Sequence, residues 1–437
     1  MNLVYNIKDK PKPGVIALSA LQQLLAILAA TIAVPSIIGN GMSQSAALFG
    51  AGVGTIVYLL FTRFNSPVFL GSSFAFLGSM ATAFAGAVSV AAGYAGLLLG
   101  ALFAGLVYVV IAVVVKFCGV KWVNKLMPAV VIGPTVAIIG LSLAGNAIGD
   151  LTGGANTYVS IICGLVTLGV TMLCSVFGKK TKMFPFIIGI CAGYVVATIF
   201  TLCGIKVVDF SAFANMQWIP DFTFVTAFKG FKDIDAAYVG TIAVAYVPVA
   251  FVVFAEHIAD HKNLSSIIGK DLLEDPGLHN TLLGDGVGSI AGAFFGGCPN
   301  TTYGESVGCV AISGNASVVT ILATAVLAMV AAFFAPFTTF LATIPGCVMG
   351  GVCVALYGFI AVSGLKMIQT VDLGDNHNLF VVSVILIAGV GGMTVSFGKV
   401  TITEVACALI LGILTNVLLG NKKAEAAEPA EAAKTEE

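Results

Sequence analysis

Acidic side chains inside apolar sequence are the residues of this chain best suited to carry chemistry. Glu256 ends an apolar run, and Asp260 follows one helical turn later on the same helix face. Two carboxylates this close resist simultaneous ionisation, so the pair can hold a proton near neutral pH. The alternative is that the apolar segment ends near Glu256, which would leave both groups in water. At membrane depth, an ionisable residue is a candidate functional residue by default.

A third carboxylate, Glu305, follows a break in an apolar segment. The stretch Cys298-Pro-Asn-Thr-Thr-Tyr-Gly-Glu305 starts with turn-forming residues, continues with residues that favour extended backbone, and ends at a predicted helix start. Many transporters build their sites from broken helices of this kind near the middle of the membrane. We therefore expect Glu305 to lie in a site, with Gly304 permitting the change of chain direction.

His257 and His261 lie next to the first two acids, and together the four side chains resemble a metal-ligand set. On a helix, however, the histidines share a face about 100° away from the face of Glu256 and Asp260. One metal ion could not readily collect all four, so we predict no metal site and no bound cofactor.

Four aromatic residues, Phe74, Phe76, Tyr303 and Tyr357, could form walls for a flat ligand. Packing against the protein core or lipid explains any one of them better when it is taken alone.

Composition excludes most soluble functions. The chain has 437 residues, of which 58% are hydrophobic and only 9% charged, against about 25% charged in soluble domains. Its net charge of −1 gives no electrostatic reason to expect nucleic acid as a partner. Ten scattered cysteines without a CxxC pair are typical of small core residues.

Long apolar segments follow one another along the chain and predict an all-α polytopic membrane protein, because a membrane span needs about 20 apolar residues. Twelve full spans are expected near residues 14–34, 45–62, 91–115, 127–146, 157–176, 183–203, 236–255, 279–296, 316–336, 344–366, 378–397 and 402–420. Two interrupted units, 67–86 and 298–313, bring the total to fourteen. As the third and tenth spans, they would be equivalent members of two inverted seven-span repeats.

The same pattern divides the chain into five parts. They are an N-terminal segment 1–13, a first repeat 14–203, a connection 204–235, a second repeat 236–420 and a disordered tail 421–437. With both termini in the cytoplasm, 16 of the 20 Lys and Arg residues face that side, as the positive-inside rule requires. The other four are Lys206, Lys229, Lys232 and Lys399.

The chain resembles the nucleobase/ascorbate transporter family, and within it the bacterial uracil permeases. The matching stretches are Ala255-Glu-His-Ile, Lys270-Asp-Leu-Leu-Glu-Asp-Pro-Gly-Leu-His279, Phe294 to Glu305, Val348-Met-Gly-Gly351 with Tyr357, and Gly71-Ser-Ser-Phe-Ala-Phe76. The Asn-Thr-Thr-Tyr-Gly-Glu run is highly specific, whereas Ala-Glu-His alone would be weak. The resemblance covers nearly the whole chain except the tail.

The resemblance implies fourteen spans in inverted repeats, with a core of spans 1–4 and 8–11 and a gate of spans 5–7 and 12–14. Short strands in spans 3 and 10 would pair across the core, and substrate would bind between their ends and span 8. It implies uracil as substrate, protons as coupling ion, membrane lipids as surroundings and a homodimer as a candidate assembly. The implied substrate-binding residues are Glu256, Glu305, Phe74, Gly304, Tyr303 and Tyr357.

Three positions depart from the family pattern. Gln23, Asp260 and Ser306 stand where the family commonly has histidine, histidine and asparagine. We expect Glu256 and Asp260 to share the transported proton. The alternative is that His261 takes the role of the missing histidine from the next position along the helix.

Other function classes remain open from the residues. A purine or xanthine symporter of the same family usually carries an amide where Glu305 stands, so Glu305 favours uracil. A passive facilitator or channel would share the binding site but not accumulate substrate. An anion transporter of the same fold would need a cation near Phe74 or Glu305, and none of the 20 Lys and Arg lies near them in sequence.

Overall fold

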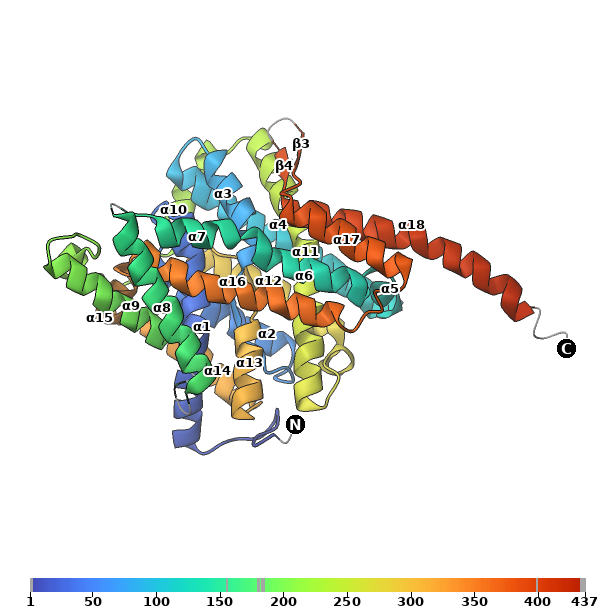
Figure 1. The fold of residues 1–437 in the computed structure, drawn as a ribbon, viewed down its shortest axis with the longest axis horizontal. Coiled ribbons are helices and arrows are strands. Elements are labelled where there is room, and N and C mark those ends of the chain that lie inside the picture. The colour runs from blue at the N-terminus through green and yellow to red at the C-terminus, as the bar shows by residue number, and fades with distance from the viewer. Residues whose placement is uncertain (1–2, 155, 179–180, 182–184, 398–399, 433–437) are drawn as a thin grey trace.

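The computed structural model describes residues 3–154, 156–178, 181, 185–397 and 400–432, and most of them are helical (Figure 1). In the first half the helices are α1 (Pro13–Ile38), α2 (Gln44–Phe61), α3 (Leu77–Ala85), α4 (Val90–Cys118), α5 (Lys121–Leu126), α6 (Ala129–Ser142), α7 (Ala144–Thr152), α8 (Thr157–Phe177) and α9 (Pro185–Leu202). After α10 (Thr223–Gly230) come α11 (Ala236–Ile268), α12 (Leu278–Gly296), α13 (Gly304–Ser313), α14 (Val318–Ala331), α15 (Ala335–Ala342), α16 (Gly346–Ile368), α17 (Asn376–Val390) and α18 (Glu404–Ala432).

Within the described residues, eight helices are long and apolar enough to cross a membrane. The number is nine if α14 and α15, which are bent by 83° relative to each other, form one span. Shorter apolar helices cover Phe74–Ala85, Asn376–Val390 and Glu404–Gly420. The fourteen spans, their inverted repeat and the domain limits drawn from them therefore stay predictions. Of the lysines used for the orientation, five lie outside the described residues: Lys179, Lys180, Lys182, Lys399 and Lys434.

Both predicted interruptions contain a strand. β1 (Leu70–Ser72) and β2 (Asn300–Thr302) pair antiparallel, with Leu70 opposite Thr302. β1 leads into the 3-10 turn η1 (Phe74–Phe76) and then α3, and β2 leads into α13. Extended backbone at membrane depth is tolerated where it is buried in protein, and every residue of both strands is buried.

Two segments differ from the predicted spans. α11 was expected to end near residue 255 but runs to Ile268, because the chain stays helical until Gly269 adopts a left-handed conformation (φ 70°). The predicted span 378–397 is helical only to Val390, after which β3 (Val395–Phe397) pairs with β4 (Val400–Ile402). Their β-branched residues favour extended backbone over helix.

The C-terminal tail is also corrected in part. Residues 421–432, which were expected to be disordered, continue α18, because Ala, Glu and Lys are strong helix formers. The remaining residues of the predicted tail, 433–437, lie outside the described part of the chain.

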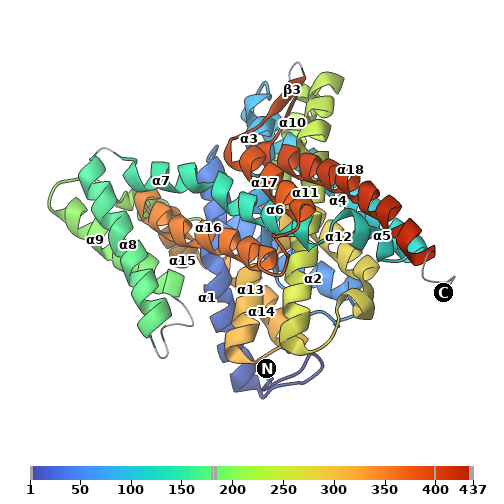
Figure 2. The ribbon, with the colours of Figure 1, turned by 45° about the vertical axis from the view of Figure 1, so that its right-hand side comes forward.

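The helices pack in two groups. One contains α1–α4 and α10–α14, and the other contains α6–α9 and α16–α18. In the second group, α8 and α9 lie side by side at one edge of the molecule (Figures 1 and 2). This division parallels the core and gate that the resemblance implies. α1 and α11 contact both groups, so residues on these two helices can face the boundary between them.

Candidate functional site

A cavity of about 260 Å³ lies between the two helix groups. Its walls come from α1, β2, α11 and α13 on one side and from α6, α8, α9 and α16 on the other. The described lining residues include three carboxylates, Glu256, Asp260 and Glu305, and no Lys, Arg or His. This volume is just below the range of about 300–1,000 Å³ that is typical of small-molecule sites.

The structure brings five of the six predicted substrate-binding residues to this cavity. They are Glu256, Glu305, Phe74, Gly304 and Tyr303. Tyr357 is not among the lining residues: it is buried on α16, and its ring meets Phe74 edge to face at 5.3 Å. Its place is therefore behind Phe74. Phe76 also stays away from the cavity and stacks on Tyr246 at 5.5 Å.

The acidic pair of α11 lies within the protein, where both side chains line the cavity. Asp260 is 7% exposed, and its Oδ2 accepts a hydrogen bond of 2.6 Å from the Thr302 hydroxyl. Glu256 lines the same cavity, and its Oε2 is buried without a hydrogen-bond partner among the described residues. The sequence alternative, in which α11 ends at Glu256 and exposes both acids, is wrong because α11 continues past them. A buried carboxylate oxygen without a partner is costly unless a proton or a ligand satisfies it.

Two helix starts meet the cavity beside these acids. α13 begins at Gly304, and Glu305 lies in its first turn. At the other side, Phe74 begins the apolar helix Phe74–Ala85. The first backbone N–H groups of a helix have no acceptor within it, so both starts can donate to a ligand.

Gly304 itself does not have the left-handed conformation that would demand glycine. A Cβ there would meet only Asp260 Oδ1, at 3.8 Å. The backbone conformation therefore does not require glycine at this position, contrary to expectation. Glycine matters here because a larger side chain would occupy the cavity. Gly71 has the tighter constraint, since a Cβ at that position would collide with the Tyr303 ring.

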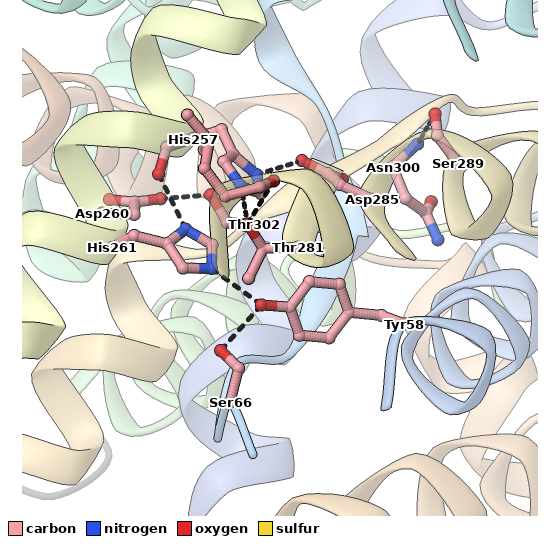
Figure 3. A network of polar contacts seen from close by, with 11 residues as sticks. Tyr58, Ser66, His257, Asp260, His261, Thr281, Asp285, Ser289, Asn300 and Thr302 are labelled. Atoms are coloured by element: carbon pink, nitrogen blue, oxygen red, sulfur yellow. Dashed lines mark hydrogen bonds and ion pairs between the residues drawn. The ribbon is translucent and has the colours of Figure 1, made fainter. Parts of the chain in front are cut away.

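Behind the cavity, the two histidines of α11 belong to a buried polar network (Figure 3). His257 Nδ1 lies 2.7 Å from Asp285 Oδ2, and its Nε2 lies 3.0 Å from the Thr281 hydroxyl. Because that hydroxyl donates to the Leu278 carbonyl, His257 Nε2 donates to it in turn. The His257–Asp285 pair then shares one further proton and is neutral overall, which suits a site that water does not reach.

His261 does not line the cavity either. Its Nδ1 donates to the His257 carbonyl at 2.8 Å, and its Nε2 lies 2.7 Å from the hydroxyl of Tyr58. Both nitrogens are thus engaged, and the side chain is fully buried (Figure 3). Among the described residues, no three His, Cys, Asp or Glu side chains are grouped so that they could hold a metal ion.

Sequence reasoning missed several members of this region. Asp285 could have been found, because it is an ionisable residue inside a predicted span. Thr302 gave no signal, since a threonine in a strand is ordinary. Two departures from the family pattern proved to be partners: the Gln23 side-chain amide donates to the hydroxyl and, at 3.3 Å, to the carbonyl of Ser306.

Comparison with known proteins shows the family of the chain. The sequence model of the Permease family (Xan_ur_permease) matches residues 14–397. The chain belongs to this permease family. The uracil permease of Bacillus caldolyticus is 38% identical over 425 residues, which are 95% of this chain and 94% of the relative. The uracil permease of Bacillus subtilis (strain 168) is 36% identical over 439 residues, 97% of each.

A solved structure supports the fold of this permease. The transmembrane domain of the cyanobacterium bicarbonate transporter BicA superposes with a TM-score of 0.64 at 15% identity, covering 92% of this chain and 96% of that one. With its apolar helices, family and structural neighbours, the permease is a multi-pass membrane protein. Its family consists of transporters rather than enzymes.

Proposed function

We propose that this permease imports uracil together with protons across the cytoplasmic membrane by alternating access. The observation that carries the proposal is the buried Oε2 of Glu256, which has no hydrogen-bond partner among the described residues. Glu256 lines a small cavity together with Glu305 and a helix start. The names of the relatives in two Bacillus species point to the same substrate.

Uracil suits the polar groups of the cavity. Its two ring N–H groups can donate to carboxylates, and its two carbonyl groups can accept from backbone amides. Glu256 and Glu305 supply the acceptors, and the starts of α13 and of the Phe74 helix supply the donors. The partial positive charge at a helix N-terminus strengthens these amides as donors. Phe74 and Tyr303 supply apolar surface for the flat faces of the ring.

Protons are suitable coupling ions because they can neutralise the carboxylates that line the cavity. Three carboxylates line a small cavity whose described lining residues include no basic side chain. Closing such a cavity against water is less costly when a proton neutralises part of that charge. Glu256 and Asp260 are the proposed carriers, and they titrate as a unit, so that no single value belongs to either residue.

The position of the cavity between the helix groups supports the proposal of alternating access. Its lining includes Ser175 near the end of α8, Pro185 at the start of α9 and Ser363 in the last turns of α16. By the orientation proposed from the lysines, these helix ends face the cytoplasm. The two helix groups also touch each other directly, through the rings of Phe74 and of Tyr357 on α16. Relative movement of the two groups would then expose the site to the opposite side.

Substrate selectivity tests the proposal. We expect labelled uracil to bind the purified permease and to be displaced by unlabelled uracil far better than by xanthine, uric acid or thymine. Displacement by xanthine at lower concentrations than uracil would overturn the assignment and favour a purine symporter.

Gly304→Val is expected to abolish uracil binding while the protein still reaches the membrane. The valine methyl groups would fill the cavity next to Asp260, whereas the single Cβ of Gly304→Ala makes an ordinary contact there. The alanine variant should therefore keep measurable binding. Uracil-induced thermal stabilisation of both purified variants checks this, and full binding by the valine variant would place the site elsewhere.

A further inference from the structure

We propose that Thr302 is a positioning residue that sets how readily Asp260 holds a proton and ties that proton to the placement of the substrate-binding segment. This inference rests on the proposed function. It starts from the hydrogen bond of 2.6 Å between the Thr302 hydroxyl and Asp260 Oδ2 (Figure 3). Thr302 is fully buried, so water does not replace this contact.

The bond joins the two parts of the site. Asp260 belongs to α11, and Thr302 ends β2, two residues before Gly304 and three before Glu305. β2 is held on its other side by β1, whose Leu70 exchanges hydrogen bonds of 2.9 and 3.2 Å with the Thr55 hydroxyl of α2. With the strand pair anchored there, the Thr302–Asp260 bond fixes α11 relative to the start of α13.

The strength of this bond depends on the proton. An ionised carboxylate is a stronger acceptor than a neutral one, and O–H···O⁻ bonds are short. The Thr302 hydroxyl therefore favours the ionised form of Asp260, and protonation of Asp260 weakens the bond. Loading the proton thus loosens the contact between α11 and the segment that carries Gly304 and Glu305.

Other titratable groups act on Asp260 in the opposite sense. Glu305 of α13 lines the same cavity as Asp260, and so does Glu256 one turn earlier on α11. Asp285 of α12 pairs with His257 in the buried network. All three are acidic and disfavour a further negative charge. His257 and His261 of the same helix are engaged in the network behind the cavity. Thr302 is therefore the hydroxyl that offsets this repulsion.

Thr302→Val tests the proposal, because valine has the same shape without the hydroxyl. Uracil binding by the purified permease is measured against pH, together with accumulation in vesicles against pH. Loss of a hydrogen bond to a charged group should move the pH midpoint of both upward by roughly 1 to 2 units. Thr302→Ser keeps the hydroxyl and should keep the wild-type midpoint. In an Asp260→Asn background, which is expected to bind uracil without accumulating it, Thr302→Val should cause no further shift in the pH midpoint of binding.

Thr324→Val is the matched control. Thr324 is a fully buried threonine of α14. Within the described part of the chain its hydroxyl bonds only to the carbonyl of Thr320 in its own helix, so its loss should leave the midpoint unchanged. If Thr302→Val does not reach the membrane, Thr302→Ala compared with Thr302→Ser isolates the same hydroxyl. If Thr302→Val or Thr302→Ala has the same pH midpoint as the wild type, the role of Thr302 is overturned while the proposed function stands. A wild-type protein that binds no uracil at any pH overturns the proposed function, and the inference with it.

Discussion

Glu305→Gln is expected to weaken uracil binding by roughly ten- to a hundredfold, which corresponds to ~1.5–3 kcal/mol for a hydrogen bond to a charged group. Glu305 lies in the first turn of α13 and lines the same cavity as the acidic pair on α11. The amide keeps the size of the side chain but replaces one carboxylate oxygen with a donor. The remaining amide oxygen is neutral and accepts a hydrogen bond from a ring N–H of uracil more weakly than a carboxylate oxygen does.

The dissociation constant of labelled uracil for the purified variant checks this expectation. Glu404→Gln is a suitable control, because Glu404 begins α18 and does not line the cavity. It should bind uracil as the wild type does. Near-normal affinity of Glu305→Gln would remove Glu305 from the site.

The second large effect concerns coupling. Asp260→Asn is expected to keep uracil binding and exchange but to lose proton-driven accumulation. Its buried side chain lines the cavity one turn from Glu256, so the two carboxylates are placed to share one proton. Asparagine can still accept from Thr302 through its carbonyl oxygen, which keeps the site assembled while removing the titratable group.

Counterflow and concentrative uptake in the same vesicles separate exchange from accumulation. His261→Gln is the informative comparison, because His261 lies in the buried network outside the cavity. We expect this variant to be less stable, since two buried hydrogen bonds are disturbed. Each folded molecule should still accumulate uracil as the wild type does. If Asp260→Asn concentrates uracil with a normal pH dependence, Glu256 alone or His261 must carry the coupling.

The strand-and-helix breaks were predictable from sequence because they depend on local residue types. Proline, β-branched residues and glycine in Cys298–Glu305 mark the change from turn to strand to helix, and β2 and α13 follow that pattern. The acids were predictable for a similar reason, since a carboxylate in apolar sequence needs a functional explanation.

Features that depend on tertiary contacts were not predictable. Hydropathy placed the end of a span at residue 255, but α11 continues because its polar residues find buried partners in α12 and β2. The pairing of Gln23 with Ser306 and the place of Tyr357 behind Phe74 are also set by helices far apart in sequence. A single sequence carries no signal for which buried polar groups will meet.

Uracil uptake into proteoliposomes with an imposed inside-alkaline pH gradient, in sodium-free buffer, tests the central claim most directly. The account predicts that labelled uracil rises above its external concentration and that a protonophore collapses this accumulation. Uracil that only equilibrates across the membrane, with a rate indifferent to the protonophore, would contradict proton-coupled import and identify a passive facilitator.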